Sequence, residues 1–306
     1  MGPLGVYLRG LAMGAADAVP GVSGGTIALI TGIYDRLVTA LTDVEPGRIA
    51  AVLRGLLRRD RATVADALRA MDAAFLVSLG LGVVSAVLVV SRVVEVALAE
   101  APAATYAFFF GLIAASAVVL YETVAVDTPG RAVAALAGFL LAFFVAGATT
   151  GGLGDGPLFV FVTGAIAISA MVLPGISGSL ILVVLGQYEY LVDTLHDFVD
   201  AVLSLVDGGS IGAAVDPGTV VATFVAGAVV GLFTVAHAIR FALDRWREAT
   251  LAFLVSLIVG ALRAPVERIA DATTAPDAAF AAVVGVAMVV GAAVVLAFDR
   301  YAGVEY

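Results

Sequence analysis

The stretch VPGVSGGTIALITGIYDRLV at residues 19–38 returns without a gap as LPGISGSLILVVLGQYEYLV at residues 173–192. An offset of 154 residues aligns the Pro-Gly steps, the Ser-Gly steps, a later glycine and a tyrosine that precedes an acidic residue. Each stretch interrupts an apolar region, 4–41 or 158–192. A continuous helix over 4–41 would be about 57 Å long, too long for a bilayer core of about 30 Å. Proline removes a backbone donor and glycine permits turns, so each region predicts a re-entrant helical hairpin.

The composition of the chain places most of it in lipid. Of the 306 residues, 62% are apolar and 13% are charged, and the mean hydropathy is +1.10. An ordinary soluble domain has roughly 25% charged residues. Long apolar runs outside the two hairpins predict six spanning helices, the fifth of them short, at 73–98, 103–126, 132–148, 219–243, 250–262 and 278–298.

The arginines orient these spans. All 16 basic residues are arginine, and six of them lie between Arg48 and Arg69. The positive-inside rule places that segment in the cytoplasm. Counting six crossings from it puts both termini in the cytoplasm, and the second hairpin then opens outside, beside the acidic stretch 193–216. We therefore expect a multi-pass protein of the cell membrane. The net charge of −9 without lysine is typical of a haloarchaeal protein and disfavours nucleic acid as a partner.

The two copies divide the chain into related halves. Residues 1–148 hold a re-entrant hairpin at 4–41, an arginine-rich cytoplasmic loop at 42–72 and three spans, and residues 149–306 hold a hairpin at 158–192 and three spans. A returning hairpin adds no net crossing, so three crossings turn the second half upside down. The predicted fold is an all-α integral membrane protein with an inverted repeat, which is the architecture of alternating-access transporters.

The hairpin tips are candidate binding sites. Irregular backbone at membrane depth has to face protein or water. A helix follows each turn, and its first amides together with a nearby serine suit an anion. Close packing of helices and a hinge are the alternative roles for these glycines. The candidate residues are Pro20, Gly21, Ser23, Gly24, Gly25 and Thr26 at the first tip and Pro174, Gly175, Ser177, Gly178 and Ser179 at the second.

Four ionisable residues at membrane depth complete the candidate site. Asp17 precedes the first turn, Arg36 and Glu189 lie on the helices that leave the two turns, and Arg263 ends the fifth span. Charged groups inside a membrane are costly and usually functional. The arginines can pair with phosphate, with Arg36 the expected phosphate contact on the first hairpin, and the carboxylates can bind a proton or hold an arginine in the empty site. Snorkelling to the interface is the alternative.

Several other chemistries are disfavoured. The chain has no cysteine and only two histidines, far apart in sequence, so we expect no metal and no other cofactor. The Gly152–Asp155 sequence GLGD matches the GxGD pattern of intramembrane aspartyl proteases, but it lies in a glycine-rich connection, and no pair of facing carboxylates is evident. The serines at the tips have no base beside them in sequence, so we expect no enzyme.

The two motifs resemble those of a known family. GAADAVPGVSGGTIALITGIYDRLV and ISAMVLPGISGSLILVVLGQYEYLV are similar to the paired signatures of the polyprenyl-phosphate transporter family, in the same order and over essentially the whole chain. The resemblance implies translocation of undecaprenyl phosphate, or of an archaeal dolichyl-type phosphate, between leaflets so that the lipid carrier is used again. The tip residues, with Asp17, Arg36 and Glu189, correspond by position.

Other functions remain open at this point. A transporter or exchanger of a small soluble anion has the same architecture, and a membrane phosphatase or a scaffold belongs to another class. A lipid carrier is the better match, because the barrier to flipping lies in the phosphate and not in the polyprenyl chain. The expected partners are a polyprenyl-phosphate lipid and the bilayer; a coupling proton or sodium ion and a homodimer are compatible with the sequence.

The orientation is testable because the chain has no native cysteine. A single cysteine near Arg58 should react with an impermeant maleimide only from the cytoplasmic side, and one near Asp207 only from the outer side. Labelling of both positions from one side in intact cells or spheroplasts would contradict the inverted topology.

Overall fold

A Pro-Gly turn ends the first helix of this computed structural model, as the sequence predicts. The structure describes the chain except for residues 1, 122–123, 150–155, 172–176, 273–276 and 303–306. Within that part the chain is helical and contains no strand. The helices of the first half are α1 (Pro3–Ala18), α2 (Gly24–Ile30), α3 (Tyr34–Thr42), α4 (Pro46–Arg58), α5 (Arg61–Ala70), α6 (Ala73–Glu100), α7 (Pro102–Tyr121) and α8 (Pro129–Thr149).

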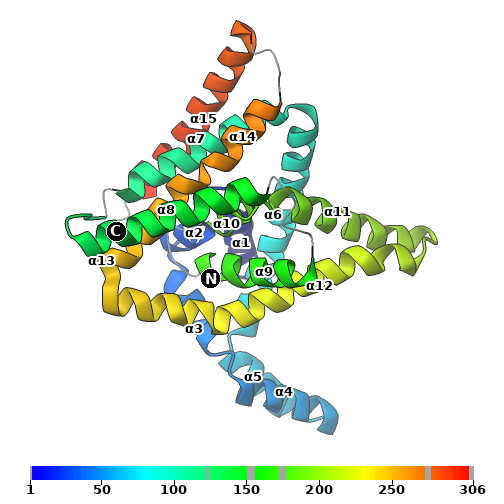
Figure 1. Cartoon of the computed structure of the whole chain (residues 1–306). Helices are drawn as coiled ribbons and strands as arrows, with labels where there is room; N and C mark the ends of the chain where they lie inside the picture. Colours follow the sequence, from blue (N-terminus) through cyan, green and yellow to red (C-terminus); the bar gives the residue numbers. More distant parts are fainter. Residues whose placement is uncertain (1, 122–123, 150–155, 172–176, 273–276, 303–306) are drawn as a thin grey trace.

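The second half begins with another helix, which the structure describes as far as Met171. Its elements are α9 (Pro157–Met171), α10 (Gly178–Val184), α11 (Tyr188–Ser204), the 3₁₀ turn η1 (Leu205–Asp207), α12 (Ile211–Phe233), α13 (Val235–Ala261), α14 (Arg263–Asp271) and α15 (Ala278–Ala302). The short helices α2 and α10, which follow the two interruptions, lie near the centre of the bundle with α1 (Figure 1).

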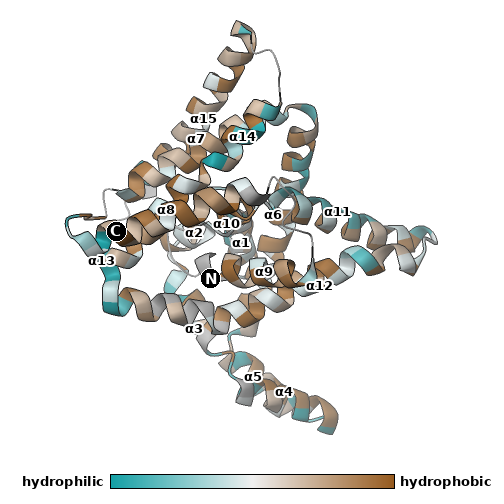
Figure 2. Ribbon diagram, viewed as in Figure 1, coloured by the Kyte–Doolittle hydropathy of each residue, from teal (hydrophilic) through white to brown (hydrophobic). Residues whose placement is uncertain are grey.

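Six helical stretches of the described chain are long and apolar enough to cross a membrane. They lie at Ala73–Glu100, Pro102–Tyr121, Pro129–Gly147, Ile211–Leu232, Phe241–Asp271 and Ala278–Ala297. Hydrophobic residues cover most of α7, α8 and α15, whereas hydrophilic residues gather on α11 and at helix ends (Figure 2). The number of predicted spans is therefore confirmed by length and composition.

The bounds of the fourth and fifth spans differ from the prediction. The fourth helix begins at Ile211, eight residues before the predicted start at Thr219, because the side chain of Ser210 caps it by accepting from the amide of Gly212 at 3.2 Å. Pro217 lies inside this helix, where it removes one backbone hydrogen bond without ending the helix. The predicted short fifth span is the second part of α13, which bends at Trp246.

The arginine-rich segment predicted as a loop is largely helical. Helix α4 begins with Pro46 at its first turn, and α5 is capped by Asp60, which accepts from the amides of Ala62 and Thr63. The hydroxyl of Thr63 also donates to Asp60, and these bonds lower the pKa of its carboxyl. The pair α4 and α5 projects away from the bundle (Figure 1).

Glycines set the closest helix contacts of the bundle. Helix α1 packs on α6, α9 on α12, α7 on α15 and α8 on α13. A Cβ atom added to Gly82 of α6 would lie 2.2 Å from the carbonyl oxygen of Tyr7, and one added to Gly227 of α12 would lie 1.9 Å from that of Phe161. Glycine at these positions lets the helix backbones approach closely. Helices associate in this way in a membrane because apolar side chains gain little by exchanging lipid for one another.

We predict that Gly82→Ala destabilises the protein while Gly80→Ala, two residues away on the same helix, does not. A Cβ at Gly82 meets the backbone of α1, whereas a Cβ at Gly80 meets no atom within 4 Å. Overpacking of this kind costs about 1–3 kcal/mol. Thermal unfolding of the two variants in detergent measures the difference, and equal melting temperatures would show that the α1–α6 contact does not limit stability.

Candidate functional site

The first hairpin tip is docked against α7. Its turn places Pro20 in the protein interior and gives Gly21 a φ of +91°, which favours glycine. The hydroxyl of Ser116 lies 2.7 Å from the carbonyl oxygen of Gly21 and 2.9 Å from that of Leu112. A Cβ on Gly21 would also come within 3.2 Å of Leu112. The turn is therefore held by a hydrogen bond from a spanning helix.

The side chain of Asp17, near the end of α1, lies against the first residue of α2. Its Oδ1 atom accepts a hydrogen bond of 2.8 Å from the amide of Gly24, and a Cβ on Gly24 would lie 2.3 Å from Oδ2. The sequence predicted a free amide at Gly24 that an anion could use. The structure instead satisfies it with a carboxylate from the end of α1, because the turn brings these residues together.

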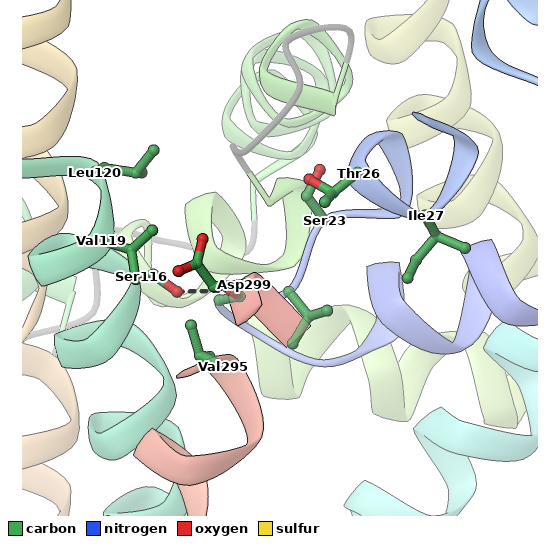
Figure 3. A pocket seen from close by; sticks show the side chains of 10 residues that line it. Ser23, Thr26, Ile27, Ser116, Val119, Leu120, Val295 and Asp299 are labelled. Carbon is green, nitrogen blue, oxygen red and sulfur yellow. Dashed lines mark hydrogen bonds between the residues drawn. The ribbon is translucent and has the colours of Figure 1, made fainter. Parts of the chain in front are cut away.

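A pocket opens beside this tip, between α7 and α15 (Figure 3). Ser23 and Thr26 project from the side of the tip, whereas Ser116 and Asp299 project from the two spanning helices. The hydroxyl of Ser23 is buried and has no hydrogen-bond partner among the described residues. We call this the inner pocket, after the cytoplasmic side that the sequence predicts for this end of α7. The residues that line it are Gly21, Val22, Ser23, Thr26, Ile27, Ser116, Val119, Leu120, Val295 and Asp299.

The second tip is described only from its serine onward. Pro174 and Gly175 lie outside the described residues, as does the GLGD sequence up to Asp155. Ser177 caps α10, with its hydroxyl 3.4 Å from the amide of Leu180 and 2.9 Å from the hydroxyl of Ser179. Ser177, Gly178 and Ser179 are all buried. The side chain of Ser177 therefore caps α10, whereas Ser23, at the N-cap of α2, makes no such bond.

The two interrupted regions of the chain touch at the centre of the protein. The hydroxyl of Tyr188, at the start of α11, donates a buried hydrogen bond of 2.6 Å to the carbonyl oxygen of Ala18, the last residue of α1. The ring of Tyr188 packs edge-on against Phe109 of α7, with 5.7 Å between centroids. Tyr188, which follows the second interruption, thus donates to the carbonyl of Ala18, which the first interruption leaves without a helical partner.

A second pocket surrounds Glu189. The hydroxyl of Tyr106 donates to Oε1 of Glu189, and the guanidinium of Arg268 lies 3.2 Å from Oε2. The guanidinium also lies 5.9 Å from the centre of the Tyr106 ring. This pocket, called the outer pocket below, is lined by Tyr106, Ala146, Val183, Gly186, Tyr188, Glu189, Ala264 and Arg268.

The sequence did not single out Tyr106 or Arg268. Arg268 follows the fifth span on the predicted outer side, where the positive-inside rule disfavours arginine, and that exception is the signal in the sequence. Tyr106 carries no such signal, because an aromatic residue near the end of a span is ordinary.

The two arginines predicted from the sequence line neither pocket. Arg36 is ion-paired with Asp72 at 2.7 Å and lies over the ring of Phe75. Arg263 is paired with Glu267 at 2.6 Å and donates to the carbonyl oxygen of Phe143. The expectation that Arg36 reaches a tip phosphate has no support in this arrangement. A group of three side chains suited to a metal is also not found in the described residues.

Comparison with known proteins points to one family. Residues 13–296 match the model of the family described as VCA0040-like, undecaprenyl phosphate translocase-like. The chain is also similar to a polyprenyl-phosphate transporter of Vibrio cholerae, at 34% identity over 263 residues, which is 86% of this chain and 77% of that protein. A similar solved structure was not found.

We predict that Tyr188→Phe lowers stability, whereas Tyr121→Phe has little effect. The first variant leaves the buried carbonyl of Ala18 without its donor, which costs about 1–3 kcal/mol. Tyr121 is 66% exposed. Thermal unfolding of both variants in the same detergent provides the comparison. An unchanged melting temperature for Tyr188→Phe would mean that the contact between the hairpins contributes nothing to the fold.

Proposed function

This chain belongs to the undecaprenyl phosphate translocase-like family, and we propose that it moves a polyprenyl phosphate between leaflets by alternating access at two re-entrant hairpin tips. It is a multi-pass membrane transporter and not an enzyme. The phosphate is the part of the lipid that resists crossing, because an ionic group loses its hydration in hydrocarbon. A protein path is needed for the headgroup, while the polyprenyl chain can remain in lipid.

The position of the two pockets along α7 supports alternating access. Tyr106 lines the outer pocket and Leu120 lines the inner pocket. Fourteen residues of helix separate these positions, which corresponds to about 21 Å along the axis. Because α7 is a candidate span, we propose opposite halves of the bilayer for the two pockets. Each is then suited to expose a headgroup to one side.

The pairing of helices supports an inverted repeat. The contact of α1 with α6 has its counterpart in that of α9 with α12, and the contact of α7 with α15 has its counterpart in that of α13 with α8. At the aligned positions Gly10 and Gly164, an added Cβ would lie 2.2 Å from a carbonyl oxygen of the neighbouring helix. In our proposal, residues 1–148 and 149–306 are the two repeats, with both termini in the cytoplasm.

The single observation that carries the mechanism is the hydrogen bond from Tyr188 to Ala18. It joins the start of α11, in one proposed repeat, to the tip of the hairpin in the other. Movement of one hairpin relative to the other must break or shift this bond, so the contact is the natural place for opening and closing to be coupled. Asp17, beside it at the tip, is the carboxylate we propose for a coupling proton or sodium ion.

The remaining tip residues have a positioning role in this proposal. Gly24, Gly25 and Thr26 form the first turn of α2, and Ser177, Gly178 and Ser179 form the start of α10. The unpartnered hydroxyl of Ser23 faces the inner pocket and is available to a headgroup there.

Transport should be measured with the purified chain in liposomes. We expect it to move a fluorescent polyprenyl phosphate between leaflets without releasing inorganic phosphate, because the chain belongs to a family of transporters. The matched lipid with a neutral alcohol in place of the phosphate should not be accelerated.

Two outcomes would overturn this proposal. Release of inorganic phosphate at a rate comparable to flipping would make the protein an enzyme. Exchange of soluble phosphate across the membrane without any lipid flipping would make it an anion transporter.

A further inference from the structure

In the outer pocket, a hydroxyl and a guanidinium hold the carboxylate of Glu189 as they would hold a bound anion. We propose that Arg268 and Tyr106 bind the phosphate monoester of the lipid and that Glu189 takes its place when the pocket is empty. This inference rests on the proposed function and names the groups that recognise the headgroup on the outer side.

The arrangement of donors carries the argument. Each oxygen of the Glu189 carboxylate has its own partner: Tyr106 donates to Oε1, and Arg268 lies 3.2 Å from Oε2. A phosphate monoester also presents several oxygens on one centre, and arginine binds such groups with a planar fork of donors. The same hydroxyl and guanidinium can therefore hold a phosphate after the carboxylate moves away.

The pair is accessible to an incoming headgroup. The side chain of Arg268 is 43% exposed and that of Glu189 is 35% exposed. Opening a fully buried pair would leave an uncompensated charge in the interior, whereas a half-buried pair in a pocket can exchange one anion for another. The three residues come from α7, α11 and α14, so the site forms only in the folded protein.

The two arginines predicted from the sequence, Arg36 and Arg263, do not line a pocket as Arg268 does. The guanidinium of Arg263 binds both Glu267 and the carbonyl oxygen of Phe143, and it lies 4.4 Å from the centre of the Phe143 ring. Arg36 lies over Phe75 and lines neither pocket. Arg268 has Glu189 as its ion-pair partner in the described chain and also lines a pocket.

Displacement of Glu189 would act directly on the contact between the hairpins. Glu189 follows Tyr188, whose hydroxyl binds Ala18 at the first tip. When a phosphate takes Arg268 and Tyr106, the carboxylate is released and the first turn of α11 loses two anchors. Binding on the outer side is thereby connected to the residue that joins the two hairpins.

Opposite effects of two substitutions test this proposal. Arg268→Gln should weaken binding of a short-chain prenyl phosphate to the purified full chain at least about tenfold, because a charge-assisted contact is lost. Glu189→Gln should strengthen binding several-fold, because the competing negative charge is removed while the shape is kept. Arg268→Lys should recover part of the affinity, since it keeps the charge and loses the fork.

The controls separate a binding role from a structural one. Arg92→Gln alters another outer ion pair, with Glu95 and Asp200, and should leave binding unchanged. Thermal unfolding of each variant shows whether it is folded. If Glu189→Gln and Arg268→Gln weaken binding equally, or if neither changes it in folded protein, the pair is structural and the inference is wrong.

Parallel titrations with inorganic phosphate distinguish the source of the phosphate group. Tighter binding of the prenyl phosphate, with both ligands dependent on Arg268, supports a lipid headgroup site. Equal binding of both ligands would assign the pocket to soluble phosphate and contradict the inference. If the wild type flips the lipid but Arg268→Gln and Glu189→Gln bind the prenyl phosphate with unchanged apparent affinity, this inference alone is wrong. If the wild type does not flip the lipid, the proposed function is wrong.

Discussion

Backbone groups exposed by an interrupted helix need partners inside a membrane, and the centre of this protein is arranged around that need. An unsatisfied amide or carbonyl in hydrocarbon costs several kcal/mol. At the first tip, Asp17 accepts from Gly24, Ser116 binds the carbonyl of Gly21, and Tyr188 binds that of Ala18. These partners come from the hairpin itself, from a spanning helix and from the second hairpin. Residues of the protein itself therefore satisfy the backbone groups that the first interruption exposes.

The spanning helices provide the frame for this centre. Apolar side chains gain little by leaving lipid for one another, so the contacts depend on close approach of backbones at glycine. Gly82, Gly227, Gly138 and Gly291 each face a carbonyl oxygen of a neighbouring helix. Because α7 pairs with α15 and α8 with α13, each half of the chain packs its spans against the other. A rigid frame of this kind suits a mechanism in which hairpins move relative to it.

The two pockets differ in charge, and that difference affects how tightly each would bind a phosphate in the proposed cycle. The outer pocket has an arginine, two tyrosines and a glutamate, whereas the described lining of the inner pocket has an aspartate and no basic residue. A phosphate bound by Arg268 on the outer side would meet hydroxyl groups and a carboxylate on the inner side. Such a site binds a phosphate more weakly, and weaker binding favours release there.

The sequence by itself determined the membrane class, the number of apolar spans and the two interruptions, because these depend on local composition and on the backbone properties of proline and glycine. Only the tertiary structure decided that Asp17 fills the amide of Gly24, that Arg36 pairs with Asp72, and that Tyr106, Glu189 and Arg268 meet. The last three lie on helices far apart in sequence, so no spacing could reveal them. Side-chain partners across a bundle depend on how helices pack, and a local pattern does not contain that information.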